Sequence, residues 1–455
     1  MRIVEGDTNT TGARTGWSAT RHDSGEAETL RRDAHAFYHQ VLSTPCLAEV
    51  VEAEGPWLTL ADGSRLLDFH GNSVHQVGYR NPEVLEAVAA EAGTLPFSPR
   101  RFANRRALEL AEHLIDVAPG DLRGDARVLL VPSGALAVGL AVKVARAVTG
   151  RHKTLGFVDA FHGASLDAAS VGGQDLFTRG MGPMMQGALH TPPPGDARCA
   201  RCKQGCCDTS CVAEIESLLA SREIAAFVAE PIRATTIARP PADYWHRVRT
   251  ICDATGTLLI FDEIPTGLAR SGEMWVSDLV GVTPDILVTG KGLGGAVFPQ
   301  AGIVGRSAFN DGGVTPIREL AIGHYTHEKS PLGAAASLAV LRIIERDGLA
   351  ARAESLGASW EAELKASLGT HPAVRTIRRV GLMLAIDLQS AGDPARPADE
   401  IANRAMYASL ARGLSYKVGG GSTLVLGPPL TIVASLLSRA TEIFAASLDE
   451  AVSVG

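Results

Sequence analysis

The stretch DILVTGKGLGG, residues 285–295, runs from a short apolar segment into a lysine that is surrounded by glycines. An apolar run of this length, bounded by turn residues, is typical of a buried strand. The lysine of a P-loop follows its glycines in the pattern G-x-x-x-x-G-K-[ST], whereas only Gly290 precedes Lys291 here. The stretch therefore favours a reactive lysine, because an apolar site lowers a lysine pKa and makes the amine a nucleophile toward aldehydes.

A second apolar run, TLLIFDEI at residues 257–264, contains the acidic pair Asp262 and Glu263 at its end. A carboxylate at the end of a buried strand is costly unless it meets a cation, a metal or a protonated ring. A simple cap of the strand end is the alternative interpretation. The lysine at the end of the next apolar run, Lys291, favours a role for Asp262 in a binding site.

Two further turns follow apolar runs. In PSGALAVG, residues 132–139, Ser133, Gly134 and Ala135 stand where a strand turns into a helix, and N–H groups at a helix start bind phosphate well. In AFHGAS, residues 160–165, Phe161 and His162 follow another strand, and the aromatic ring could stack on a flat cofactor. Core packing is the alternative for Phe161.

Together these features describe one ligand, pyridoxal 5'-phosphate (PLP). Its phosphate would lie on the helix start, its ring on Phe161, its pyridine nitrogen beside Asp262 and its aldehyde on Lys291. Asp262 would keep the ring nitrogen protonated, so that the ring can accept electrons. Once a substrate amine has displaced it, Lys291 would act as the general base.

The organisation of the chain fits such a site. A chain of 455 residues is too long for one ordinary core, so more than one lobe is expected. Strands that alternate with helices predict an α/β fold with a mainly parallel sheet, whose ligands gather at the carboxyl ends of strands. We expect an N-terminal arm with part of a small domain at 1–75, a large PLP-binding domain at 76–335 and a C-terminal small α+β domain at 336–455.

The charge and the hydropathy pattern exclude some partners. The formal net charge is -7 without a Lys/Arg-rich run, which argues against nucleic acid. The polar and acidic start lacks the apolar segment of a secretory signal, and no uninterrupted apolar run of about 18 residues predicts a membrane span. We therefore expect a cytoplasmic protein that acts on a small molecule.

Five of the seven cysteines crowd into CARCKQGCCDTSC, in an insertion at about residues 192–211. In a reducing compartment such a cluster suggests a structural metal more than disulfides. The spacing lacks the paired C-x2-C halves of a zinc ribbon, so a surface insertion with free thiols stays open. The candidate metal ligands are Cys199, Cys202, Cys206 and Cys211.

The stretches FDEIPTGLARSGEMW and GVTPDILVTGKGLGG resemble the signature of the class III aminotransferase family. The resemblance implies PLP fold type I, with a mainly parallel seven-stranded sheet in a large domain and a smaller α+β domain. It also implies that Asp262 faces the pyridine nitrogen, Lys291 forms the Schiff base, Phe161 stacks and Glu230 lies beside the cofactor. Thr326, in HYTHEKSPLG, would reach the cofactor phosphate across the interface of a homodimer with shared active sites.

Three departures from the family pattern bear on the reaction. In GGGSTLVLGPPL, Val425 stands where the family arginine usually grips the α-carboxylate of an amino or keto acid. Losing such a bidentate arginine removes roughly 2–5 kcal/mol of binding. Pro265 replaces the glutamine of D-E-x-Q-T-G, and Leu136 and Gly139 replace the glutamates of S-G-A-E-A-N-E. Because transamination needs a bound keto acid, these changes favour elimination.

Elimination beside the amine-bearing carbon, followed by hydrolysis of the enamine, yields an aldehyde and ammonia. The family contains such lyases, and DFHGNSVHQVGYRNP and LPFSPRRFAN resemble members that act on a small phosphonate-bearing amino alcohol. A phosphonate dianion needs cations, for which Arg100 and Arg101 are the first candidates, while His70 and Asn72 would line the substrate entrance. Further candidate cations are Arg14, Arg233, Lys329 and Lys417.

Three alternatives to this lyase remain open. The first is a class III ω-aminotransferase that acts on a small amine with an unusual carboxylate grip. The second is a phospho-lyase that acts on a phosphoethanolamine-type phosphate amine. The third, a regulator or binding protein of the same fold, is disfavoured by the Asp262–Lys291 pair, because simple binding does not need a poised base.

Overall fold

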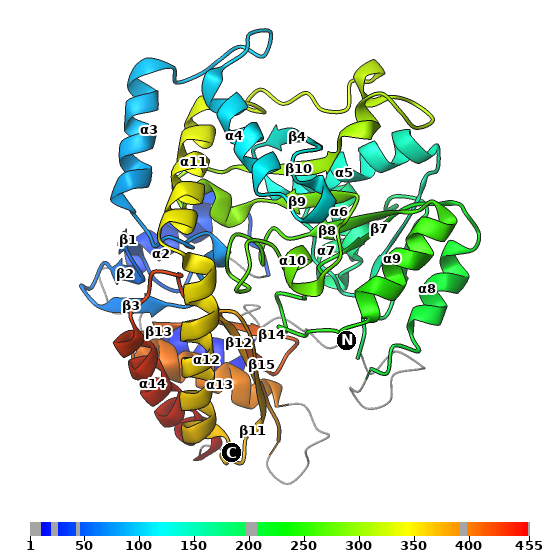
Figure 1. The fold of residues 1–455 in the computed structure, drawn as a ribbon. Coiled ribbons are helices and arrows are strands. Elements are labelled where there is room, and N and C mark those ends of the chain that lie inside the picture. The colour runs from blue at the N-terminus through cyan, green and yellow to red at the C-terminus, as the bar shows by residue number, and fades with distance from the viewer. Residues whose placement is uncertain (1–10, 20–25, 42–45, 196–206, 391–397, 454–455) are drawn as a thin grey trace. The chain divides into compact units, whose positions relative to one another are not determined.

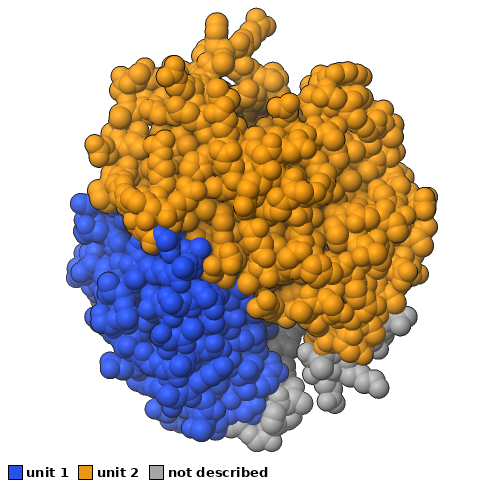
Figure 2. Space-filling view, viewed as in Figure 1, with its two compact units in different colours: residues 1–81, 235–237, 348–455 blue, residues 82–234, 238–347 orange. Residues whose placement is uncertain are grey.

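The computed structural model describes residues 11–19, 26–41, 46–195, 207–390 and 398–453. Contacts divide the chain into two compact units, coloured separately in Figure 2. The small unit comprises residues 1–81, 235–237 and 348–455, and the large unit comprises 82–234 and 238–347. The sequence suggests boundaries at 75/76 and 335/336, whereas the contacts place them at 81/82 and 347/348. The helix Pro331–Arg346 therefore lies wholly in the large unit.

The large unit is built on a seven-stranded sheet with the order β4-β10-β9-β8-β7-β5-β6 (Figure 1). Its strands are β4 (Ala126–Val131), β5 (Lys153–Phe157), β6 (Ala188–Thr191), β7 (Ile224–Ala229), β8 (Leu258–Asp262), β9 (Ile286–Thr289) and β10 (Ala301–Arg306). β10 pairs antiparallel with β4 and β9, and every other pairing in this sheet is parallel. The prediction of a mainly parallel seven-stranded sheet is therefore confirmed.

Helices cover both faces of this sheet. The helices of the large unit are α3 (Pro82–Thr94), α4 (Arg105–Asp116), α5 (Gly134–Thr149), α6 (Leu166–Gly172), α7 (Asp175–Thr178), α8 (Val212–Leu219), α9 (Tyr244–Thr255), α10 (Val276–Val280) and α11 (Pro331–Arg346). On β7, Ala226 and Val228 belong to the core beneath α5, whereas Phe227 and Ala229 belong to the core beneath α8 and α9. This alternation follows from the two-residue period of a strand and makes a three-layer unit.

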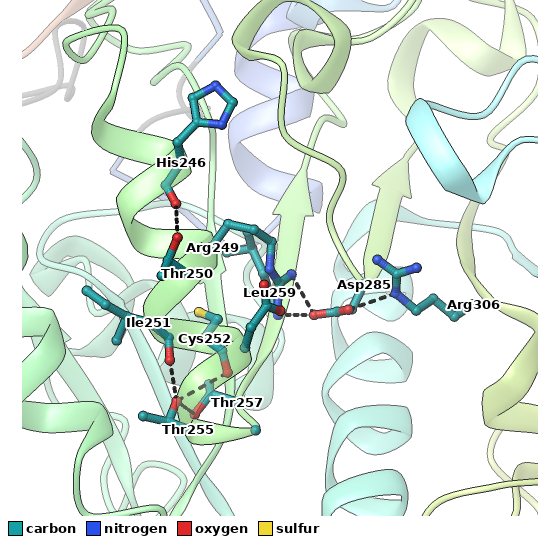
Figure 3. A network of polar contacts seen from close by, with 12 residues as sticks. His246, Arg249, Thr250, Ile251, Cys252, Thr255, Thr257, Leu259, Asp285 and Arg306 are labelled. Carbon is teal, nitrogen blue, oxygen red and sulfur yellow. Dashed lines mark hydrogen bonds and ion pairs between the residues drawn. The ribbon is translucent and has the colours of Figure 1, made fainter.

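A buried carboxylate fixes the edge of the sheet at which β9 begins (Figure 3). Asp285 is 6% exposed and accepts hydrogen bonds from the backbone N–H of Leu259 and from Arg249 Nη1, each at 2.8 Å. Arg306 Nε donates to its other oxygen at 2.9 Å. Asp285 thereby ties α9, β8 and the end of β10 together.

The small unit contains two four-stranded sheets, ordered β1-β2-β3-β13 and β11-β12-β15-β14. Their strands are β1 (Val50–Glu54), β2 (Trp57–Leu60), β3 (Arg65–Asp68), β11 (Val374–Val380), β12 (Met383–Leu388), β13 (Leu414–Ser415), β14 (Lys417–Gly419) and β15 (Thr423–Leu426). Its helices are α1 (Gly12–Ala19), α2 (Glu26–Ala36), α12 (Leu349–Leu368), α13 (Asp399–Ala411) and α14 (Ala434–Ser453).

Short 3₁₀ helices connect several of these elements. They are η1 (Gly71–Ser73), η2 (Gly120–Leu122), η3 (Lys291–Gly294), η4 (Ser307–Asn310) and η5 (Ile317–Glu319). Among the described residues, no helix has the length and apolar character needed to span a membrane.

Candidate active site

The polar residues expected at strand ends gather at one edge of the large sheet. Glu230 follows β7, Asp262 ends β8 and Lys291 follows β9, and these strands are adjacent in the sheet. Ala229 pairs with Phe261, and Asp262 pairs with Val288, so the three ends lie in register. The expectation that these side chains share the carboxyl edge, where ligands of such sheets bind, agrees with this arrangement.

Ile264 connects the loops that follow these strands. A Cβ placed on Gly134, at the start of α5, would lie 2.7 Å from Ile264 Cδ1. A Cβ on Gly290, beside Lys291, would lie 3.5 Å from Ile264 Cγ2. A Cβ on Gly163, after β5, would collide with Ala135 at the same helix start. The glycines thus allow four loops to close around one point, and sequence reasoning had not assigned Ile264 to the site.

Asp262 and His162 form the buried polar centre of this edge. His162 Nδ1 and Asp262 Oδ2 are 2.7 Å apart, and the two side chains are 0% and 2% exposed. Asp262 Oδ1 accepts a hydrogen bond from the N–H of Ile264 at 3.0 Å. His162 Nε2 is buried and has no hydrogen-bond partner in the described part of the chain. The histidine therefore orients the carboxylate, a role that its sequence position alone did not give.

Glu263 has a different role from its neighbour. Its carboxylate accepts hydrogen bonds from the N–H groups of Val276 and Ser277 at the start of α10, and from the Ser277 hydroxyl. Burial raises the pKa of Glu263 to about 7, although these hydrogen bonds act in the opposite direction. Glu263 thus caps the start of a helix, whereas the alternative weighed for the acidic pair was a cap of the strand end.

The start of α5 offers an anion site. Ser133 is the N-cap, and its hydroxyl accepts a hydrogen bond from the N–H of Leu136 at 3.3 Å. The N–H groups of Gly134 and Ala135 lie in the first turn, where no intrahelical acceptor exists. These two groups are the donors that a phosphate at the helix start would meet.

Lys291 has an unusual backbone conformation. It begins η3 with a φ of 45°, between Gly290 and Gly292. A residue with a Cβ in this left-handed region costs on the order of 1–3 kcal/mol, and such strain gathers at functional sites. The flanking glycines let the backbone turn sharply after β9. Within this turn, Lys291 is the residue with a Cβ that carries the strain.

Glu230 lies next to this centre with most of its side chain covered. It is 5% exposed, and its Oε2 accepts a hydrogen bond from the N–H of Ala234 at 2.9 Å. Burial and then the charge of Asp262 raise the pKa of Glu230, while His162 and Arg233 act to lower it. The neutral acid is therefore the favoured form of this side chain over a wider pH range than for an exposed glutamate.

The departures from the family pattern have structural counterparts. A Cβ on Gly139 would collide with the carboxylate of Asp167, a residue of α6, which accepts a hydrogen bond from Ser165 Oγ at 2.5 Å. An acid from a neighbouring helix thus fills the space beside position 139. Val425 pairs directly with Lys417 across β15 and β14, which puts the two side chains on one face of that sheet. A lysine thus stands one strand away from position 425, a relation that only the register reveals.

The remaining candidate substrate residues lie in two places. In the large unit, Arg100 Nε pairs with Glu328 Oε1 at 3.1 Å, and Glu328 Oε2 accepts from the N–H of Tyr325 at 3.1 Å. Arg100 thereby lies against the segment that carries Thr326, and both Arg101 and Thr326 are exposed. In the small unit, His70 is the N-cap of η1 and Asn72 lies within it, and the His70 N–H donates to Asp68 Oδ1 at 2.9 Å.

The cysteine cluster gives no metal site in the described residues. Cys199, Cys202 and Cys206 lie outside them, while Cys207 and Cys211 have their sulfur atoms 3.4 Å apart. Within the ranges that the structure covers, no group of three or more His, Cys, Asp or Glu side chains could hold a metal ion. The expectation of a structural metal thus has no support from this part of the chain.

Known proteins resemble the chain along most of its length. The family model for class III aminotransferases matches residues 38–448. The (R)-1-hydroxy-2-aminoethylphosphonate ammonia-lyase of Vibrio splendidus is 38% identical, over 97% of this chain and 94% of that protein. The 5-aminovalerate aminotransferase DavT of Pseudomonas aeruginosa is 30% identical, over 89% of this chain and 94% of that protein.

Solved structures agree with the fold. An aminotransferase of Bacillus anthracis is 27% identical with a TM-score of 0.83, over 93% of this chain and 98% of that one. An ω-transaminase of Pseudomonas jessenii, solved in complex with PMP, has a TM-score of 0.85 at 24% identity, over 95% of this chain and 99% of that one. The expected PLP-dependent transferase fold type I is confirmed.

Proposed function

The chain belongs to the class III aminotransferase family, and we propose that it is a PLP-dependent ammonia-lyase that eliminates the hydroxyl group of a small phosphonate-bearing amino alcohol. The substrate proposed is (R)-1-hydroxy-2-aminoethylphosphonate, and the products are phosphonoacetaldehyde and ammonia. The relative that acts as such a lyase is 38% identical to this chain, against 30% for the aminovalerate aminotransferase.

The observation that carries the proposal is the residue at position 425. Val425, on β15, is an apolar side chain where the family pattern has the arginine that holds a keto acid. An aminotransferase must bind such an acid to regenerate its cofactor, whereas a lyase needs none. The loss of this grip therefore removes a requirement of transamination and leaves elimination intact.

The residues at the sheet edge fit PLP. The N–H groups of Gly134 and Ala135 would hold its phosphate, Asp262 would meet its ring nitrogen and Lys291 its aldehyde, while Phe161 supplies an exposed aromatic face. When bound, PLP supplies an electron sink that stabilises negative charge on the substrate carbon.

The chain's own groups then perform the remaining work. Lys291 Nζ takes the proton from the amine-bearing carbon, which is general base catalysis. His162 holds Asp262 in the orientation that a ring nitrogen requires, since it occupies Oδ2 at 2.7 Å. The hydroxyl group departs from the neighbouring carbon, and the released enamine hydrolyses to the aldehyde and ammonia. We further propose a homodimer, in which the exposed Thr326 reaches the cofactor phosphate of the partner subunit.

The position of Lys417 favours one alternative, an ω-aminotransferase. Lys417 lies directly opposite Val425 and would place an ammonium group on the same face of β14 and β15. A lysine there could hold a carboxylate as a point charge and so support an ω-aminotransferase. A phospho-lyase would use the same edge of the sheet with phosphate, rather than hydroxide, as the leaving group.

One assay separates these functions. Purified, PLP-loaded protein is incubated with (R)-1-hydroxy-2-aminoethylphosphonate without any keto acid, and ammonia and aldehyde are measured. We expect both products in equal amounts. No release, together with pyruvate-dependent turnover of small amines, would contradict the lyase in favour of the aminotransferase. Phosphate release from phosphoethanolamine alone would favour the phospho-lyase.

A further inference from the structure

The proposed elimination needs an acid as well as a base. Hydroxide is a poor leaving group at neutral pH, so a proton must reach the departing oxygen as the carbon–oxygen bond breaks. Lys291 has just accepted a proton from the neighbouring carbon, and a second group would let the two transfers be concerted. We propose that Glu230 is this second group, the catalytic acid that protonates the leaving hydroxyl; the inference rests on the proposed function.

The sheet register brings Glu230 to the reacting edge. β7 and β8 are adjacent parallel strands, and Ala229 pairs with Phe261, so Glu230 follows β7 at the level of Asp262. Neighbouring strands lie about 4.8 Å apart. The strand alternation assigns Val228 and Ile260 to the core beneath α5, and Glu230 and Asp262 continue on that face. Glu230 therefore lies on the same side of the sheet as the helix start that would hold the phosphate.

The surroundings favour the neutral form of Glu230. The charged or titratable groups that act on it are Asp262, His162 and Arg233. Burial is the largest influence and the Asp262 carboxylate the next, and both raise the pKa of Glu230. Two neighbouring carboxyl groups cannot both ionise cheaply, and Asp262 is the one with the histidine partner at 2.7 Å. Glu230 is thus the member of the pair in which protonation is favoured.

The hydrogen bonds also direct that proton. The Ala234 N–H occupies Oε2 at 2.9 Å, which favours Oε2 as the acceptor oxygen of the neutral acid. In the described part of the chain Oε1 has no hydrogen-bond partner, and the side chain keeps 5% of its surface accessible. The O–H group is thus on Oε1, which is the oxygen available to a bound molecule.

In the other two buried acids at this edge, both carboxylate oxygens already take part in hydrogen bonds. Asp262 uses one oxygen for His162 and the other for the N–H of Ile264. The carboxylate of Glu263 accepts three hydrogen bonds from Val276 and Ser277 at the start of α10. Of the three acids, only Glu230 combines a raised pKa with an oxygen that no described group occupies.

The step balances. The C–H bond at the amine-bearing carbon breaks, its proton goes to Lys291 Nζ, and its electron pair forms the new C=C bond. The C–O bond breaks with its pair on oxygen, and the Glu230 proton converts the departing group into water. Lys291 has gained the proton that Glu230 has lost, and exchange with solvent restores both groups.

The test compares leaving groups in Glu230→Gln. Glutamine keeps the size of the side chain but cannot donate an acid proton, so ammonia release from the hydroxyl substrate should fall by about 10²–10⁴-fold. In D2O, NMR should still show exchange of the hydrogen on the amine-bearing carbon, because Lys291 is intact. With 1-fluoro-2-aminoethylphosphonate, whose fluoride leaves with little need of a proton, most of the loss should disappear.

Two variants guard the interpretation. Glu263→Gln removes the adjacent buried acid, and any loss there should be equal for the hydroxyl and fluoro substrates, because Glu263 only caps α10. Glu230→Asp keeps an acid and should recover part of the hydroxyl reaction; if Glu230→Gln does not fold, the ratio of the two substrates in Glu230→Asp decides the matter instead, with a ratio equal to that of the wild type counting against the proposal.

The outcomes separate the two proposals. If Glu230→Gln releases ammonia within a few-fold of the wild type, or slows both substrates equally, Glu230 is not the acid, while the lyase function stands. If the wild type releases no ammonia from either substrate, the proposed function itself fails.

Discussion

At the scale of single residues, the site depends on an acid and a lysine at the ends of neighbouring strands. Asp262 and Lys291 could be predicted from the sequence because each follows a short apolar run, and such runs end at a common edge of a parallel sheet. The place of Ile264 and the pairing of Lys417 with Val425 could not, since they depend on loop closure and on strand register rather than on local sequence. The separate roles of Asp262 and Glu263 likewise appear only from their hydrogen bonds.

The residue-scale prediction concerns Lys291→Ala. Without the amine, ammonia release should fall by roughly 10²–10⁴-fold, because the general base is gone. The absorbance of the imine that holds the cofactor in the resting enzyme should disappear as well. The matched control is Lys365→Ala, a lysine of α12 whose side chain is 55% exposed and which should leave both readouts unchanged. Survival of the absorbance in Lys291→Ala would show that another residue holds the aldehyde.

At the scale of elements, the sequence predicted the strands and helices of the large unit well. Glycines close α5 and α9, and Gly150 and Gly256 adopt φ of 68° and 67°, as a helix end requires. The unit to which α11 belongs could not be predicted, because an amphipathic pattern shows that a helix has a buried face but not which neighbour covers it. In the structure α11 packs on α3 and α4, within the large unit.

The Asp285 network gives an element-scale prediction (Figure 3). Asp285→Asn leaves Arg249 and Arg306 without a buried anion and should lower the free energy of unfolding by about 3 kcal/mol. Asp121→Asn is the control, because Asp121 also pairs with Arg306 but its side chain is 64% exposed. That variant should cost less than about 1 kcal/mol. Equal losses in chemical denaturation would contradict a special role for the buried carboxylate.

Two helical glycines, one in each unit, test how closely their helices are packed. A Cβ on Gly357, in α12, would collide with the backbone oxygen of Gly381, whereas nothing lies within 4 Å of a Cβ on Gly93, in α3. Gly357→Ala should therefore destabilise the protein by about 1–3 kcal/mol. Gly93→Ala should be neutral or stabilise it by up to about 1 kcal/mol, through helix propensity. A melting temperature that rises in both variants would show that α12 does not approach Gly381 closely.

At the scale of the whole molecule, the two units were expected in outline, while residues 235–237 were not expected in the small unit. This short segment begins just after Ala234, and the backbone oxygen of Thr236 accepts a hydrogen bond from Arg378 Nε of β11 at 2.9 Å. Local sequence patterns cannot reveal such an excursion, since three residues carry no periodicity.

The proposed homodimer predicts complementation. Lys291→Ala chains lack the base and Thr326→Ala chains lack the group offered to the partner, so each homodimer should be weakened in both sites. After unfolding and refolding as a mixture, half of the dimers should contain one intact site, and activity should return to about a quarter of the wild-type value. The measurement is ammonia release before and after mixing; no recovery would contradict active sites shared between two chains.

The central claim, elimination rather than transamination, is tested most directly by counting turnovers without an amino acceptor. An aminotransferase stops after one turnover per active site, because its cofactor keeps the amino group until a keto acid removes it. The account predicts many equivalents of ammonia and phosphonoacetaldehyde per active site when the protein meets excess (R)-1-hydroxy-2-aminoethylphosphonate and no keto acid. A burst of aldehyde without ammonia, which ends at one equivalent per active site and resumes only when pyruvate is added, would contradict it.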